Sequence, residues 1–372
     1  MKVLLGWLVL ALVVVACALP RVESLGLYYD EAFLAQQARD FTEPARAGVH
    51  PPSVTTTTLA GRPFPIRNAA YLGSLKSQLL IPSLAAFGSS PKVLRVTTLC
   101  TGLLGLLLCM LWIARLFDDR TALITGALVA SDPTFYFFSQ FEWGPFTSML
   151  LCRGAGLWLL AIAFGDDTSW RRWPALVLGA AAMGLGVYSR VDFVVILAAL
   201  FLGALLLHRE VVLGIVRDQA ARVAVGAGVF LIAVTPVIVV VGQVLGAGSG
   251  IAGRGDFAYR AQVFASTLDG SHFYRLLSAG GLFEEMFADA APTTSFPYVL
   301  GLAAIICTAT IAGKSTTTAR PFAFALLSAA LIGVGMLAIP GAVRAHHMLN
   351  VLPLAHLVVA TAGVALWDRD WA

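Results

Sequence analysis

The chain has 372 residues, of which 58% are hydrophobic and 12% charged, and its formal net charge is +4. A soluble domain carries about 25% charged residues, so this composition, with a mean hydropathy of +0.82, indicates an integral membrane protein. No basic run is interleaved with aromatic residues, so nucleic acid is not expected as a partner. The five cysteines lie in apolar runs without a CxxC pair, so they are interpreted as small hydrophobic residues rather than as a zinc site or a disulfide framework.

Apolar runs of about 17 to 25 residues, broken by short polar pieces, predict spanning helices, because the strands of a membrane barrel would give a weaker, alternating pattern. The predicted fold class is all-α: a polytopic membrane helical bundle of about ten spans that forms one domain over residues 1–372. The spans are expected at residues 3–19, 94–114, 121–139, 146–164, 174–188, 191–207, 223–245, 297–313, 321–339 and 349–367.

The polar connections predict the orientation of the bundle. With a cytoplasmic amino terminus, the cytoplasmic connections are short and rich in Lys and Arg, whereas the long segments 20–93 and 246–296 are extracytoplasmic and poorer in both. This is the positive-inside pattern. The small-x-small pattern Ala16-Cys17-Ala18 is compatible with cleavage after residue 18, but a single Lys before the first apolar run and the many later spans favour an uncleaved signal anchor. Either way, the residues after the first span lie outside.

The stretch "SLGLYYDEAFLAQQARDF", residues 24–41, directly follows the first span and contains the adjacent carboxylates Asp30 and Glu31. On a helical wheel Asp30 shares an apolar face with Leu27, Leu34, Ala38 and Phe41, as expected of a helix lying in the membrane interface. A carboxylate near hydrocarbon and aromatic rings is expected to have a raised pKa, which suits a general base. The structural alternative is that Asp30 caps the amino terminus of this helix.

An apolar span followed by an extracytoplasmic "YYDEAFLAQQARDF" resembles the start of the GT-C glycosyltransferases, specifically the protein O-mannosyltransferase and aminoarabinose-transferase superfamily (glycosyltransferase family 39-like). Later pieces that fit in the order of the family are "AAYLGSLKSQLLIPSLAAFGSSPKVLR", "ALVASDPTFYFFSQFEWGPFTSMLL", "GLGVYSRVDFVVI" and "RAHHMLNVLPLAHLVVA". The resemblance covers most of the chain. It implies a GT-C type bundle in a cell membrane, with the bacterial cytoplasmic membrane as the favoured setting.

The resemblance also implies a chemistry. A polyprenyl-phosphate sugar donor lies in the membrane with its headgroup on the outer side, and an acceptor hydroxyl of a lipid, glycan or protein attacks the anomeric carbon. By resemblance Asp30 accepts the proton of that hydroxyl, and Glu31 is its companion. The leaving lipid phosphate needs fixed cations or hydrogen-bond donors.

Five residues at predicted outer helix ends are candidates for binding the donor phosphate: Lys76, Arg190, Arg344, His346 and His347. Each of the first two has a structural alternative. Lys76 could extend its ammonium group to the membrane interface, and Arg190 could simply pair with Asp192. The family often has Arg-Tyr near "RAHHMLN", so the histidine pair is a departure from its pattern.

Glu142, in "FSQFEWGPF", stands where the family commonly carries a second acidic residue, and it is expected to bind the acceptor or a metal. Some relatives use a divalent metal, but no ligand set in this sequence is convincing, so the metal site is unknown. Arg153, inside a predicted span, needs a partner that the sequence does not identify.

The long outer segments are expected to cover the site. Residues 42–68 are rich in Pro, Thr and Gly and predict an irregular loop over the membrane. "FAYRAQVFASTL" and "HFYRLLSAGGLFEEMF", at 257–268 and 272–287, predict short extracytoplasmic interfacial helices.

Three other functions remain open from the sequence. A transporter or flippase would show corresponding broken helices in two halves of the chain, and no convincing internal repeat is seen. An undecaprenyl-diphosphate-dependent polysaccharide polymerase or ligase would favour an Arg-rich outer loop, and residues 246–296 hold few arginines. A relative that keeps the scaffold without catalysis is the third alternative.

Overall fold

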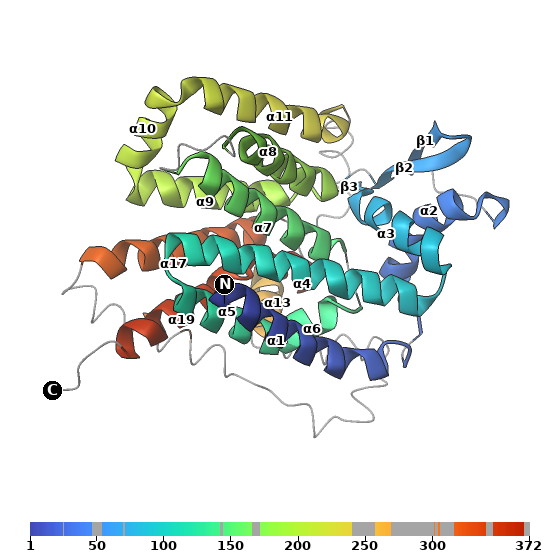
Figure 1. Ribbon diagram of the computed structural model, residues 1–372, viewed down its shortest axis with the longest axis horizontal. Coiled ribbons are helices and arrows are strands. Elements are labelled where there is room, and N and C mark those ends of the chain that lie inside the picture. Colours follow the sequence, from blue (N-terminus) through green and yellow to red (C-terminus); the bar gives the residue numbers. More distant parts are fainter. Residues whose placement is uncertain are drawn as a thin grey trace.

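Long apolar helices lie side by side in the computed structural model, and a small group of helices and strands covers one end of them (Figure 1). The structure describes residues 1–24, 26–46, 54–69, 71–141, 144–165, 172–239, 257–268, 301, 304–305, 316–339 and 345–367. The helices of the bundle are α1 (Lys2–Ala18), α4 (Pro91–Leu116), α5 (Asp119–Ser131), α6 (Pro133–Phe138), α7 (Phe146–Ala163), α8 (Arg172–Ser189), α9 (Phe193–Leu207), α11 (Ala220–Ile238), α17 (Thr316–Ala338) and α19 (Leu354–Trp367).

The remaining elements are η1 (Leu19–Arg21), α2 (Tyr29–Thr42), η2 (Pro44–Arg46), β1 (Thr55–Leu59), β2 (Arg62–Ala69), β3 (Leu72–Gly73), α3 (Leu75–Phe87), α10 (Arg209–Asp218), α13 (Phe257–Leu268), α18 (Ala345–Met348) and η3 (Leu349–Val351). We call α2, the three strands and α3 the N-terminal cap. The cap lies at the end of the bundle where α1 ends and α4 begins, and α10 lies at the opposite end (Figure 1).

The predicted spans coincide with helices wherever the structure describes them. Only 297–313 cannot be compared, because most of it lies outside the described residues. In the described part of the chain, five helices are long and apolar enough to cross a membrane, or six if the bent pair α9–α10 counts as one span. The all-α bundle is therefore confirmed, whereas the total of ten spans stays a prediction.

Local sequence explains where the helices begin. The Ser90 side chain accepts a hydrogen bond from the Val93 amide at 3.2 Å at the start of α4, and Asp118 accepts one from the Thr121 amide at 2.8 Å at the start of α5. The predicted span 121–139 is divided into α5 and α6. Asp132 ends α5 and caps α6, and the following proline occupies the first position of α6, where its missing amide does no harm.

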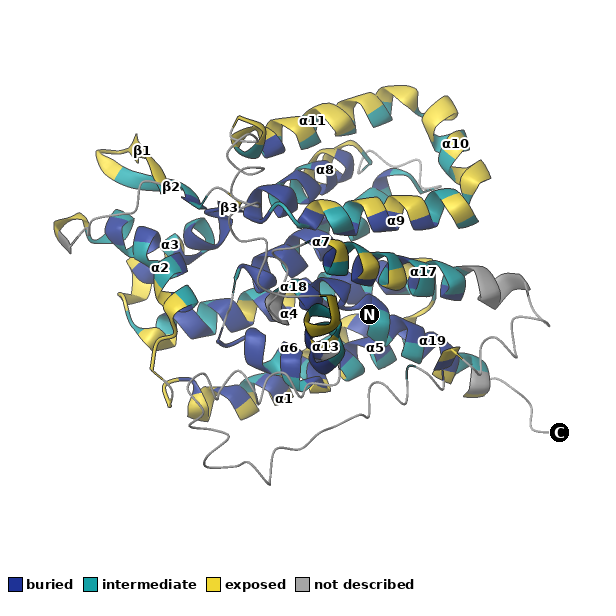
Figure 2. Cartoon of the chain, turned by 180° about the vertical axis from the view of Figure 1, so that it is seen from behind, coloured by how far each residue is buried: buried dark blue, intermediate teal, exposed yellow. Residues whose placement is uncertain are grey.

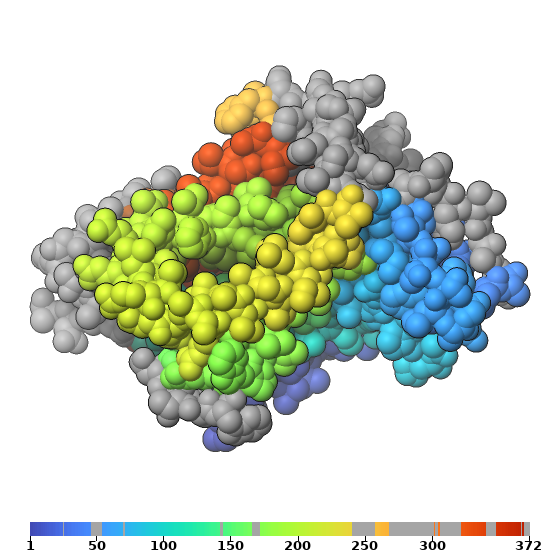
Figure 3. Space-filling view, turned by 90° about the horizontal axis from the view of Figure 1, so that it is seen from above, coloured from blue at the N-terminus to red at the C-terminus, as the bar shows by residue number. Residues whose placement is uncertain are grey.

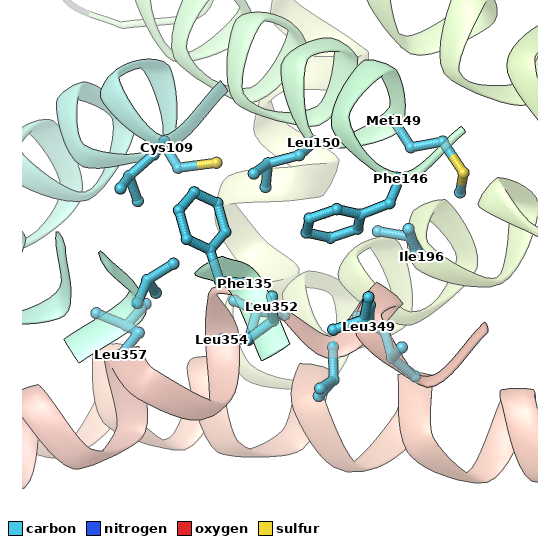
Figure 4. Close-up of a cluster of buried hydrophobic side chains, with 14 of the residues drawn as sticks. Cys109, Phe135, Phe146, Met149, Leu150, Ile196, Leu349, Leu352, Leu354 and Leu357 are labelled. Atoms are coloured by element: carbon cyan, nitrogen blue, oxygen red, sulfur yellow. The ribbon is translucent and has the colours of Figure 1, made fainter. Parts of the chain in front are cut away.

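Close helix packing forms the core. A Cβ atom on Gly105 of α4 would lie 2.9 Å from the Leu151 amide nitrogen, and one on Gly154 of α7 would lie 2.8 Å from the Gly105 carbonyl oxygen. Small residues therefore let the two backbones approach closely, as is common between membrane helices. Below this crossing, Figure 4 shows the rings of Phe135 and Phe146 in the same apolar cluster, with centroids 6.4 Å apart in an edge-to-face arrangement.

The N-terminal cap corrects the predicted irregular loop at 42–68. Strands β1 and β2 form an antiparallel hairpin, with Leu59 opposite Arg62, and β3 pairs with β2 on the other side. All of β1 is exposed, so its run of threonines is a solvent-facing strand rather than a loop. The helix α13 confirms the predicted helix at 257–268, whereas 272–287 lies outside the described residues.

Candidate active site

Asp30 lies in the first turn of α2, which begins at Tyr29 in the N-terminal cap. The N-cap residue of this helix is Tyr28, so the alternative in which Asp30 caps the helix is wrong. Asp30 is half-buried, whereas Glu31 is buried. The predicted apolar face is only partly right, because Leu34 is buried but Glu31, rather than Asp30, is the most buried carboxylate of the first turn. The carboxylate that keeps access to solvent is therefore Asp30.

Glu31 holds α2 in place. Its carboxylate accepts hydrogen bonds from Nε of Arg95 at 2.9 Å and from the backbone amide of Tyr28 at 3.0 Å. Arg95 is fully buried; it also donates to the carbonyl oxygens of Val22 and Gly26. These contacts tie α2 to the first turns of α4 and to the end of the first helix. They fit the predicted companion role, in which Glu31 fixes the geometry of its neighbour.

Tyr71 lies between β2 and β3. The pKa of Tyr71 is raised above its ordinary value, because burial raises it most and Asp30, Tyr29 and Asp192 raise it further, against the lowering effect of Arg190. Tyr71 nevertheless remains 40% exposed. Sequence reasoning missed this tyrosine, although it is the third residue of the quoted piece "AAYLGSLKSQLLIPSLAAFGSSPKVLR".

Arg190 and Asp192 form the second group, at the turn between α8 and α9. Arg190 is buried and donates a hydrogen bond to the Asp192 carboxylate, so the predicted pairing is confirmed. Asp192 also lies 3.1 Å from Nδ1 of His347 and accepts a hydrogen bond from the Asn350 side chain at 3.3 Å. Arg190 contacts His347 as well. The structure therefore brings together two of the five predicted phosphate-binding residues, Arg190 and His347.

The pKa of Asp192 is lower than its ordinary value. Burial by itself would raise this pKa, but Arg190 and His347, through their charges and hydrogen bonds, outweigh burial. The carboxylate is consequently ionised at neutral pH and holds the Arg190 and His347 side chains in one arrangement.

The N-terminal cap is fastened to this turn by the backbone. The amide of Val191 donates to the carbonyl of Tyr71 at 3.3 Å, and Leu72 forms a β-bridge with Arg190. A Cβ atom on Gly73 would lie 2.1 Å from the carbonyl oxygen of Tyr188, so only glycine allows this approach. Tyr71 and Arg190 are therefore held beside each other by a close-fitting junction.

Lys76 is buried in α3, so the alternative in which it extends to the membrane interface is wrong. Its ammonium group donates to the hydroxyl of Thr98 at 2.7 Å and to that of Thr147 at 3.4 Å. The next residue, Ser148, contacts Ser189 at 3.1 Å, directly before Arg190. Lys76 thus lies where α3, α4 and α7 meet. Residues 147 and 148 of α7 contact Lys76 and Ser189 respectively, so Lys76 is near the turn that carries Arg190.

Several predicted site residues cannot be placed. Arg344 and Glu142 lie outside the described residues, and the backbone of His346 belongs to α18 while its side chain is not described. Among the residues that the structure describes, no group of three or more His, Cys, Asp or Glu could hold a metal ion. No chemical step is therefore assigned to a metal.

Two further buried polar contacts were not foreseen. Arg153 donates to the backbone carbonyl of Asn350 at 2.6 Å, which supplies the partner that the sequence left unidentified. His356 of α19 lies 2.9 Å from the Asp132 carboxylate. Both contacts join early helices to the segment after residue 345, next to the turn that carries Asp192.

Comparisons with known proteins agree with this architecture. Residues 79–240, less than half of the chain, match the family model described as dolichyl-phosphate-mannose-protein mannosyltransferase. No curated protein sequence matches the chain significantly. Among solved structures, ArnT from Cupriavidus metallidurans bound to undecaprenyl phosphate is similar with a TM-score of 0.59 at 17% identity, over 98% of this chain and 61% of that chain.

A second similar structure is the oligosaccharyltransferase AglB from Archaeoglobus fulgidus, in complex with an inhibitory peptide and a dolichol-phosphate. Its TM-score is 0.55 at 16% identity, over 98% of this chain and 50% of that one. The chain therefore spans about three fifths of the ArnT chain and half of the AglB chain. At these identities the likeness defines the fold, which is that of the GT-C enzymes. The protein is a multi-pass membrane protein with this fold.

Proposed function

We propose that the protein is a glycosyltransferase that moves a sugar from a polyprenyl-phosphate donor to an acceptor hydroxyl at the outer face of the membrane. One observation carries the proposal: the N-terminal cap, which holds the half-buried carboxylate Asp30 in the first turn of α2, is joined through Tyr71 and Leu72 to the turn that holds the buried guanidinium Arg190. A base and a cation held by two joined elements suit a reaction in which an acceptor loses a proton while a phosphate leaves.

The reaction then follows from these positions. The acceptor hydroxyl attacks the anomeric carbon, its proton passes to Asp30, and the bond between that carbon and the phosphate oxygen breaks. The leaving lipid phosphate takes the bonding electrons and carries the resulting charge. Attack on the face opposite the leaving group inverts the anomeric configuration, which is the outcome that the family resemblance favours.

Among the described residues, Arg190 and His347 are proposed to stabilise that charge. Their contacts with Asp192 hold the two side chains in the same place. Lys76 contacts Thr147 of α7, and the next residue of α7 contacts Ser189, directly before Arg190. Lys76 is therefore proposed to add positive charge near this turn. Arg344, His346 and Glu142 stay candidates for phosphate and acceptor binding by family resemblance.

The similar structures support the donor class. The ArnT structure contains undecaprenyl phosphate, and the AglB structure contains a dolichol-phosphate with a peptide. A lipid-linked donor therefore fits this fold, and the acceptor is a lipid, glycan or protein hydroxyl. A divalent metal stays an optional cofactor, to be tested by comparing turnover with chelator and with added Mn²⁺ or Mg²⁺.

The decisive experiment supplies the purified full-length protein with radiolabelled polyprenyl-phosphate sugars and membrane extract, and compares wild type with Asp30→Asn. We expect the variant to lose about 10²- to 10⁴-fold in turnover, the usual contribution of a general base. Glu23→Gln is the matched control, because Glu23 is an exposed carboxylate a few residues earlier in the same connection. Its turnover should equal that of wild type.

Other outcomes separate the alternatives. Equal turnover in wild type and Asp30→Asn would reject the base assignment. Transfer from polyprenyl-diphosphate donors alone would indicate a polymerase or ligase. Absence of transfer with every donor, together with movement of lipid-linked sugar across reconstituted vesicles, would indicate a flippase; absence of both would indicate a noncatalytic relative.

A further inference from the structure

The helix α10 lies across the end of the bundle farthest from the N-terminal cap (Figure 1). It follows α9 after a break at His208, and the two helix axes differ by 104°. Since α9 is an apolar helix running with the bundle, a turn of this size directs α10 along the membrane plane. The next helix, α11, returns toward the cap, and both α10 and α11 lie at the molecular surface in Figure 3.

One face of α10 is apolar and is not covered by the described protein. No residue of α10 is buried, and Val211, Leu213 and Val216 are 60%, 52% and 49% exposed. The centre of the apolar face is formed by Val212 and Ile215, which are partly exposed, and Glu210 and Arg217 lie opposite these two residues on the helical wheel. Figure 2 shows the exposed surface continuing from α10 along α11. A helix with this division of residues lies in the boundary between lipid headgroups and acyl chains.

A groove of about 370 Å³ lies where α10 and α11 meet the first turn of α8, and two arginines line it. Arg172 donates to the Gly165 carbonyl at 2.7 Å while its Nε is buried without a hydrogen-bond partner. Arg222 donates to the Gln219 side chain at 2.9 Å. Neither guanidinium pairs with a carboxylate among the described residues, because Asp218 is engaged by its neighbour Arg217 at 2.7 Å.

Trp173 completes the groove. The Arg222 guanidinium lies 5.9 Å from the centre of the Trp173 ring, and Trp173 is 48% exposed. Tryptophan is enriched at the level of lipid headgroups, and arginine binds phosphate through two parallel hydrogen bonds. The groove therefore presents two cations and an interfacial aromatic ring beside a helix whose apolar face is suited to lipid.

We propose that α10 lies in the headgroup region of the leaflet opposite the candidate active site, and that the groove beside it binds the phosphate of an anionic phospholipid through Arg172 and Arg222. In the predicted topology this leaflet is cytoplasmic, the side where anionic lipids attract basic segments. The site is at the other end of the bundle from Asp30, so it does not depend on the proposed function.

Native mass spectrometry of the delipidated full-length protein tests the site. Phosphatidylglycerol and phosphatidylcholine with identical acyl chains are titrated separately onto wild type and onto the double variant Arg172→Ala/Arg222→Ala. We expect wild type to bind phosphatidylglycerol about tenfold more tightly than phosphatidylcholine, and the double variant to lose this preference. Equal preference in both proteins would overturn the proposal.

Two further variants separate charge from misfolding. Lys92→Ala removes an exposed cation at the start of α4, at the opposite end of the bundle, and should keep the full preference. The double variant Arg172→Lys/Arg222→Lys keeps both charges and should retain most of it. If the lysine pair lost the preference as completely as the alanine pair, while both eluted as wild type does in size-exclusion chromatography, the charge-based assignment would also be overturned.

Discussion

The N-terminal cap and the α10 corner, residues 209–222, use the same residue types in opposite ways. In the cap, Glu31 and Lys76 are buried and have charged or polar partners in α4, which are Arg95 and Thr98. At the α10 corner, Arg217 and Asp218 are exposed and pair with each other at the surface, while valine and leucine side chains also face outward.

The difference follows from what surrounds each region. A buried charge is costly unless it is paired, so the contacts of Glu31 and Lys76 fix the cap against α4. Exposed pairs contribute little, and exposed apolar side chains are favourable only where lipid covers them. The cap therefore has the rigidity that an active site requires, and the α10 corner has the surface that a membrane contact requires.

Among the substitutions that test this difference between the two regions, Arg95→Ala is expected to have the largest effect on stability. The substitution leaves the Glu31 carboxylate buried without its partner, which should lower the free energy of unfolding by about 3 to 5 kcal/mol. Thermal unfolding in detergent measures it. The double variant Glu31→Gln/Arg95→Met should lose less than the sum of the two single losses. Arg217→Ala, in the exposed pair, is the control and should leave the unfolding temperature unchanged.

A second pair of substitutions compares apolar packing. Leu80 of α3 is fully buried in the cap, whereas Leu213 of α10 is 52% exposed. Leu80→Ala should destabilise by about 2 to 5 kcal/mol, and Leu213→Ala should change the unfolding free energy by less than about 0.5 kcal/mol in detergent. Comparable losses at the two positions would show that α10 packs against protein rather than lipid.

The pH dependence of stability tests the Asp192 contacts. The pKa of Asp192 is lowered in the folded protein, so its contribution is fully present above the unfolded-state pKa of about 4 and is lost as pH falls through the folded-state value. Asp192→Asn should therefore cost about 2 kcal/mol at pH 7 and give a shallower loss of stability below pH 4. Parallel acid limbs in wild type and variant would contradict the assignment.

The smallest expected effect concerns Tyr71. Its raised pKa keeps the phenol protonated at neutral and moderately alkaline pH, so it can donate a hydrogen bond to a substrate oxygen. Tyr71→Phe should lower turnover about five- to tenfold through loss of that bond. Since the phenol does not ionise in this range, wild type and variant should give pH profiles of the same shape between pH 7 and 10. An alkaline limb present only in wild type would show that Tyr71 titrates there.

Sequence patterns predicted the bundle well because span length is fixed by membrane thickness. The hairpin was missed because its strands carry Pro63 and Pro65 and a run of exposed threonines, which are typical of loops. Strand β2 is central in the sheet, but it pairs with β3 only at Arg67 and Ala69, so on that side Pro63 and Pro65 have no strand partner and their missing amides are tolerated. The break at Asp132 was visible in the sequence as an Asp-Pro pair inside the predicted span 121–139. This pair could have been used to divide the span into two helices.

The site residues stay predictions. Asp30 and Glu31 were proposed from their place after the first span, and Arg190, Lys76 and His347 from their charge at helix ends. Their partners were not, because the contact of Glu31 with Arg95 joins residues 64 positions apart, which no local period records. A signal existed: Arg95 is a charge in the first turn of a predicted span, where an ionic group needs a partner.

The tip of the β1–β2 hairpin has a use in structure determination. Ala60 and Gly61 both have positive φ angles, 51° and 75°, and a Cβ atom on Gly61 would meet nothing within 4 Å. The hairpin projects from the body of the molecule (Figure 1), next to the candidate site but away from the lipid-facing helices. A short epitope inserted at this turn would give a 39.3 kDa membrane protein a rigid handle for an antibody fragment, and so an alignment marker for electron cryomicroscopy.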